Sequence, residues 1–127
     1  MVRFILDIIA DKVQNLRPFP EEIRIAYHDP CYLGRHENCY ILPREILSGI
    51  KNVKLLEFKK SRERSECCGG LLSLTYPEIA EKIAKNRLEG MEAELIVTSC
   101  PFGTEIMQRL SHIEVKDICE VLLERLG

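Results

Sequence analysis

The sequence LIVTSCP, at residues 95–101, contains the pattern that decides the fold. Its first four residues are apolar or β-branched, which is typical of a short strand buried on both faces of a parallel sheet. A cysteine follows almost directly, and Pro101 suits the first turn of a helix. Residues 95–101 therefore predict a strand, a cysteine at position 100 and the start of a helix in immediate succession.

Strands and helices also alternate on both sides of this stretch. Alternating polar and apolar residues predict a strand at 22–27, and a second strand is expected at 53–58. Apolar residues at helical spacing predict helices at residues 4–13, 41–50, 77–89, 101–110 and 115–126, with a short strand near Ile113. This alternation predicts an α/β fold with a small, mainly parallel sheet in a three-layer arrangement.

The chain of 127 residues is expected to form a single domain, 1–127, in which residues 1–20 supply an N-terminal amphipathic helix and a linker. A formal net charge of −2 gives no electrostatic reason to expect nucleic acid or an anionic membrane as a partner. Asp7, Asp11 and Lys12 interrupt the apolar start, so neither a membrane span nor an export signal is expected. The expected compartment is the cytoplasm, where structural disulfides are rare.

Six cysteines in such a chain are better explained by metal binding or catalysis than by disulfides. Cys31 follows the first predicted strand, Cys67 and Cys68 lie in the loop after the second, and Cys100 follows the third. Loops beyond the carboxyl ends of parallel strands meet at one edge of the sheet, where ligands bind. The four cysteines are therefore expected to gather at that edge.

The local sequence around each of these cysteines favours the thiolate form or an unusual backbone. Pro30 before Cys31 and Pro101 after Cys100 predict helix starts, and a helix N-terminus stabilises an anion. Two glycines follow the adjacent Cys67 and Cys68 and permit backbone angles that let both thiols face one centre. Four thiolates suffice for a tetrahedral zinc ion or a cubane iron–sulfur cluster.

Three further residues are candidates of lower rank. Cys39 is expected to be an ordinary buried thiol, although it is the obvious reserve ligand. His28 is expected to support or pack beside the site and is a second reserve ligand. Cys119 falls on the apolar face of the last predicted helix, where core packing is the expected role.

The stretches at residues 27–35, 43–44, 63–70 and 98–102 together resemble the CCG cysteine-rich domain. This domain occurs, usually duplicated, in one of the subunits of heterodisulfide reductase and in the iron–sulfur subunits of glycolate and lactate oxidases. The resemblance runs from about residue 22 onward. It implies an iron–sulfur cluster, which in the reductase is non-cubane and cleaves a disulfide between two thiol cofactors, or in some relatives a zinc ion.

The chain departs from the family pattern in two ways. Gly103 stands where the family has its last cysteine, so four ligands favour a cubane cluster of the 4Fe-4S type, or zinc, over a five-cysteine centre. Family members also usually carry two such domains, whereas this chain carries one. The resemblance therefore implies a partner: a second copy, or other oxidoreductase subunits, together with an electron-transfer protein such as a ferredoxin-like or flavin protein.

The expected function is that of a heterodisulfide-reductase-like iron–sulfur oxidoreductase module. It would transfer electrons, and reduce a disulfide, at a cluster ligated by Cys31, Cys67, Cys68 and Cys100. Two alternatives remain open at this point. One is a zinc-binding module with a structural or assembly role, and the other is a metal-free thiol redox protein.

Overall fold

The computed structural model describes residues 2–30, 33, 39–62, 65 and 71–126 of the chain. Within these residues the strands are β1 (Ile23–His28), β2 (Val53–Glu57), β3 (Leu95–Thr98) and β4 (Glu114–Asp117). They form one sheet in the order β2-β1-β3-β4, and each pairing is parallel. The predicted α/β class with a small parallel sheet is confirmed.

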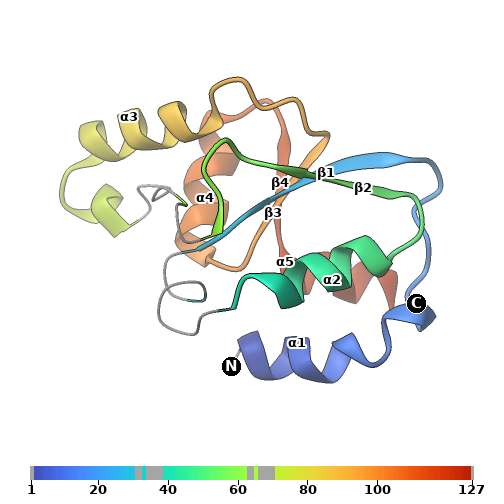
Figure 1. The fold of residues 1–127 in the computed structure, drawn as a ribbon. Helices are drawn as coiled ribbons and strands as arrows, with labels where there is room; N and C mark the ends of the chain where they lie inside the picture. Colours follow the sequence, from blue (N-terminus) through green and yellow to red (C-terminus); the bar gives the residue numbers. More distant parts are fainter. Residues whose placement is uncertain (1, 31–32, 34–38, 63–64, 66–70, 127) are drawn as a thin grey trace.

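Helices cover both faces of this sheet (Figure 1). One face carries α2 (Ile41–Gly49) and α5 (Ile118–Arg125), with α1 (Val2–Ala10) packed against α2. The other face carries α3 (Pro77–Leu88) and α4 (Pro101–Leu110). Two short 3-10 helices, η1 (Val13–Asn15) and η4 (Leu71–Leu74), complete the described elements. No helix in the described part of the chain combines the length and apolar character needed to cross a membrane.

Strand residues alternate between two apolar cores, one on each face of the sheet. Ile25 and Tyr27 of β1 pack with α1, α2 and α5, whereas Ala26 between them packs with α3 and α4. In β3, Leu95 and Val97 lie in the first core and Ile96 lies in the second. This alternation, with side chains buried on both faces, produces the predicted three-layer arrangement.

The predicted helix and strand boundaries agree with the structure except in the last segment. Val115, expected at the start of the last helix, lies in β4, where it pairs with Ile96 and is buried. The helix begins at Ile118, because the Asp117 side chain accepts a hydrogen bond from the Cys119 amide (2.8 Å) and caps it. Gly90, expected to end the helix before it, adopts a φ of 76° just beyond α3.

Because every strand is parallel, the carboxyl ends of all four meet at the same edge of the sheet. His28 pairs with Thr98, and Thr98 pairs with Asp117. On the other side of β1, Tyr27 pairs with Glu57. The segments that follow β1, β2 and β3, which carry the predicted ligands, therefore start side by side.

Candidate metal centre

Cys100 is the predicted ligand that the structure describes. It is the N-cap residue of α4, directly after β3, and its side chain is partly exposed. The Cys100 carbonyl accepts hydrogen bonds from the amide and the hydroxyl of Thr104 (2.9 and 3.0 Å), which fixes the first turn of the helix. A partly exposed thiol at a helix N-terminus matches the environment predicted for a thiolate ligand.

The other three predicted ligands, Cys31, Cys67 and Cys68, lie outside the described residues, so their convergence with Cys100 stays a prediction. The residues that lead into them are described. Asp29 lies two positions before Cys31, and Ser65 lies two positions before Cys67. The positions of these stems show what the edge of the sheet can bring together.

Hydrogen bonds join the stems of the three cysteine-bearing segments directly. The Ser65 hydroxyl donates to the Asp29 carbonyl (2.9 Å), which links the Cys67–Cys68 segment to the Cys31 segment. The Thr98 hydroxyl donates to the His28 carbonyl (3.1 Å), and the Tyr27 and Ser99 hydroxyls are 3.1 Å apart. The Cys31 segment is therefore tied at its root to both of the other segments.

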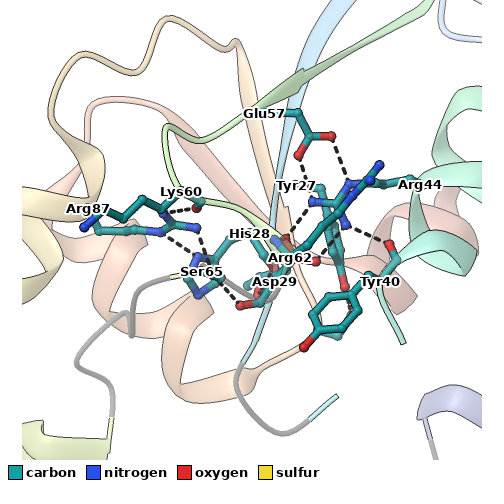
Figure 2. A network of polar contacts seen from close by, with 12 residues as sticks. Tyr27, His28, Asp29, Tyr40, Arg44, Glu57, Lys60, Arg62, Ser65 and Arg87 are labelled. Atoms are coloured by element: carbon teal, nitrogen blue, oxygen red, sulfur yellow. Dashed lines mark hydrogen bonds and ion pairs between the residues drawn. The ribbon is translucent and has the colours of Figure 1, made fainter. Parts of the chain in front are cut away.

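Arg44 of α2 holds the Asp29 carboxylate from one side (Figure 2). Its two terminal nitrogens donate to Asp29 Oδ1 and Oδ2 at 2.7 and 2.6 Å, and the guanidinium also contacts both carboxylate oxygens of Glu57 at 2.8 and 2.9 Å. The Arg62 amide donates to Asp29 Oδ2 at 2.6 Å. Burial alone would lower the pKa of Arg44, but the hydrogen bonds to Asp29 and Glu57 outweigh it and raise the pKa.

Arg87 of α3 approaches the same stems from the opposite side (Figure 2). Its Nε donates to His28 Nδ1 (3.1 Å), Nη1 donates to the Lys60 carbonyl (2.6 Å) and Nη2 donates to the Ser65 hydroxyl (3.0 Å). The guanidinium also stacks over the Phe58 ring, 4.2 Å from its centroid. One side chain thus contacts the end of β1 and two points of the loop after β2.

His28 is held as a neutral, buried imidazole. Burial lowers its pKa to about 3, and the nearby charge of Arg87 lowers it further against the opposing effect of Asp29. Because Arg87 donates to Nδ1, the proton of the neutral ring lies on Nε2. In this tautomer neither ring nitrogen offers a free lone pair, which favours the supporting role expected for His28 over its use as a reserve ligand.

The two remaining described cysteines lie away from this edge of the sheet. Cys39 is buried in the apolar core with Leu33, Ile46 and Leu47, as expected of an ordinary thiol. Cys119 is partly buried against the same core, and burial followed by the charge of Asp117 raises the pKa of its thiol. Among the described residues alone, no three histidine, cysteine or acidic side chains come close enough to hold a metal ion.

Comparison with known proteins adds an independent line of support. The family model for the CCG cysteine-rich domain matches residues 25–104. The chain belongs to this family. The matched range runs from β1 to the first turn of α4, so it includes all four predicted ligands together with Arg44 and Arg87.

Proteins similar to this CCG domain are subunits or parts of larger redox proteins. The chain is 34% identical to one subunit of the dihydromethanophenazine:CoB–CoM heterodisulfide reductase of Methanosarcina barkeri, over 100% of this chain and 33% of that protein. It is 33% identical to one subunit of the fumarate reductase (CoM/CoB) of Methanothermobacter marburgensis, over 93% and 26%. It is 34% identical to the probable iron-sulfur-binding oxidoreductase FadF of Bacillus subtilis, over 93% and 19%. The chain therefore spans a third or less of the length of these curated relatives.

Sequence reasoning missed the arginines that organise the stems of this CCG domain. The signal for Arg87 was available: it follows Ala80 and Ala84 at helical spacing, so a charged residue falls on the apolar side of a predicted helix. Such a residue must find partners when it is buried. Arg44 stood beside Pro43 in a stretch that carried the family resemblance, but its ion pairs cross three elements and have no pattern in the sequence.

The described residues fit a centre ligated by thiolates. Cys100 offers one thiol at a helix N-terminus, and hydrogen bonds between neighbouring stems bring the starts of the other two cysteine-bearing segments to the same edge. Thiolate sulfur is the donor that iron–sulfur clusters and zinc share. The donor set alone does not choose between them.

Proposed function

We propose that this CCG domain is an iron–sulfur oxidoreductase module, with a 4Fe-4S cluster ligated by Cys31, Cys67, Cys68 and Cys100. The observation that carries the proposal is the joining of three cysteine-bearing stems at one edge of the sheet by the hydrogen bonds of Ser65 and Thr98. The names of its relatives agree, since they include a subunit of a heterodisulfide reductase and an iron-sulfur-binding oxidoreductase.

The choice of a cubane cluster rests on the number of cysteines available. Gly103 is buried within α4, where the family resemblance places a further cysteine. Four thiolates match the ligand requirement of a cubane, whereas a centre that needs five would lack one here. The bound cluster supplies one-electron redox chemistry, and the protein's part is to hold the thiolates in place and limit solvent access.

We further propose that the substrate class is a disulfide between two thiol cofactors, as the name of the Methanosarcina relative states for that protein. Reduction of one disulfide breaks the S–S bond and consumes two electrons and two protons to yield two thiols. The electrons would come from a reduced ferredoxin-like or flavin protein. Because the cubane passes one electron at a time, each disulfide needs two transfers.

The module is proposed to work in an assembly, either as a homodimer or with other oxidoreductase subunits. Its relatives are much longer proteins, and two of them are named as subunits. Large apolar side chains are exposed where η4 leads into α3, among them Leu74 (76%), Tyr76 (55%) and Ile79 (51%). An apolar surface of this kind is typical of a contact with a partner. A cytoplasmic setting is proposed because Cys39, Cys100 and Cys119 are present as thiols.

Anaerobic expression and purification test the proposal. The expected product is brown, contains about four iron and four sulfide per chain, and gives a 4Fe-4S electron paramagnetic resonance signal after reduction. Colourless protein with one zinc per chain would establish the zinc alternative and reject the proposal. Metal-free protein with titratable thiols after anaerobic reconstitution would favour a thiol redox protein instead.

A further inference from the structure

We infer that Arg87 is a positioning residue for the cluster-binding cysteines, an inference that rests on the proposed function. Arg87 belongs to α3 and lies far from the predicted ligands in sequence. Its guanidinium fixes the end of β1 against the loop after β2, and these two segments lead into Cys31 and into Cys67 and Cys68. Its role is to set the distance between those thiols before any metal arrives.

The geometry of the three Arg87 hydrogen bonds supports this role. Nε contacts His28, three residues before Cys31, and Nη2 contacts Ser65, two residues before Cys67. The third bond, from Nη1 to the Lys60 carbonyl, holds the intervening loop. The Ser65 hydroxyl accepts from Arg87 while it donates to the Asp29 carbonyl. The two stems are thus joined both directly and through Arg87.

A guanidinium is the side-chain group whose shape suits this task. Its planar fork presents donors in fixed directions, so three bonds to three segments define a geometry that a rotating ammonium cannot reproduce. Stacking on the Phe58 ring at 4.2 Å fixes the plane of the fork. Arg87 is 6% exposed, and α3 turns the small, fully buried Ala80 and Ala84 towards the sheet on the same side. The short side chains let the helix approach closely enough for the arginine to reach the loop.

Arg87 also determines the state of His28. Its donation to Nδ1 leaves the ring with a proton on Nε2, so His28 acts as a hydrogen-bond donor and not as a ligand in this arrangement. Partners that orient metal ligands in this way typically change metal affinity about 10–100-fold when they are removed. A lysine at position 87 would keep the positive charge but lose the fixed fork.

The test compares Arg87→Lys with Arg109→Lys in anaerobically purified protein. Arg109 lies on α4, half exposed, in surface ion pairs with Glu81 and Glu105. We expect Arg87→Lys to retain the far-ultraviolet circular dichroism of the wild type, but to lose its iron to a chelator at least about 10-fold faster. Its reduced cluster should also show altered resonance g values, a readout that a general loss of stability would not move. Arg109→Lys should match the wild type in both measurements.

Ser65→Ala provides a second variant if Arg87→Lys fails to fold, because it removes one arginine contact and leaves the other two. It should show the same changes at reduced size. Wild-type rates and g values in the folded Arg87→Lys or Ser65→Ala variant would overturn the positioning role while leaving the proposed function intact. Failure of the wild-type chain itself to bind iron, or cadmium as a thiolate probe, would overturn both.

Discussion

The two edges of the parallel sheet are built in different ways. At the carboxyl edge, five buried polar or charged residues interlock: His28, Asp29, Arg44, Ser65 and Arg87. At the amino edge, the side-chain contact between β1 and the turn before β3 is the Arg24–Glu94 ion pair, whose 3.3 Å contact joins side chains that are 45% and 49% exposed. Solvent satisfies the charges at one edge, and only protein groups can do so at the other.

This difference shows where the fold tolerates an energetic cost. Removing a charge from water costs several kcal/mol unless partners replace its hydration, and a packed apolar contact would hold two strands as well. A fold that buries two arginines, a carboxylate and an imidazole beside the same loops gains defined positions for those loops. The carboxyl edge is therefore organised around the segments that carry the predicted ligands, and the following predictions test that contrast.

The largest effect is expected from Arg44→Leu. This change leaves the Asp29 carboxylate, 2% exposed, without the two hydrogen bonds that Arg44 gives it. Breaking a buried ion pair from one side costs about 3–5 kcal/mol, so the free energy of unfolding of the metal-free chain should fall by that amount. Urea denaturation measures it. A loss below about 1 kcal/mol would show that water already reaches this edge.

The next effect is a loss of stability in acid that depends on His28. Its pKa is about 3 in the folded chain, below the ordinary value of 6.5, so between these pH values the unfolded chain binds a proton that the folded chain does not. Stability is therefore unaffected by this group above pH 6.5 and falls as the pH drops towards 3. From about pH 7 to about pH 5 the wild type should lose about 2 kcal/mol more than His28→Gln.

His112→Gln is the matched control for this acid effect, because His112 is exposed. Denaturant titrations at about pH 7, 6 and 5 give the three slopes. His112→Gln should retain the wild-type slope. If His28→Gln also retained it, the imidazole could not be the buried neutral group described above.

A smaller effect distinguishes the thiol at the carboxyl edge from the thiol in the last helix. Cys100 lies at the N-terminus of α4, whereas burial and then Asp117 raise the pKa of Cys119. In the metal-free chain at mildly acidic pH, Cys100 should be alkylated at least about 10-fold faster than Cys119. Mass spectrometry of the labelled peptides decides the order. Earlier labelling of Cys119 would mean that α5 opens more readily than its packing indicates.

The smallest effect is expected at the amino edge. Glu94→Gln removes the charge of an exposed ion pair and keeps an oxygen that can accept from Arg24. Exposed pairs contribute about 0.2–1 kcal/mol, so the unfolding free energy should change by no more than that, and cluster binding should not change. A loss comparable to that of Arg44→Leu would remove the contrast between the two edges.

The sequence predicts the parts of this fold that depend on local chemistry. The apolar run of β3 and the proline after Cys100 predicted a strand and a helix start, and both are confirmed. Val115 was misplaced in a helix because its strand exists only through pairing with β3, a contact that no local pattern records. Ile79 fitted an apolar helical face but is exposed, since the neighbouring Ala80 makes the contact with the core.

The site was predictable to the extent that it depends on residue type and strand order. Cysteines after parallel strands indicate a common edge, and the structure places Cys100 there, at the end of β3. The supporting arginines were not predictable in the same way, because Arg44 and Arg87 act through bonds to residues that are 15 and 59 positions away in sequence. Such bonds become visible only when the chain is folded.

The most direct test of a thiolate-ligated cluster at the carboxyl edge is the iron content of Cys100→Ser beside that of Cys119→Ser, both purified anaerobically. Loss of one of four thiolate ligands should reduce bound iron by about 10-fold or more. Cys119 lies in α5 against the apolar core, so Cys119→Ser should retain the wild-type iron content. Equal iron in the two variants, or a loss confined to Cys119→Ser, would contradict a cluster at this edge.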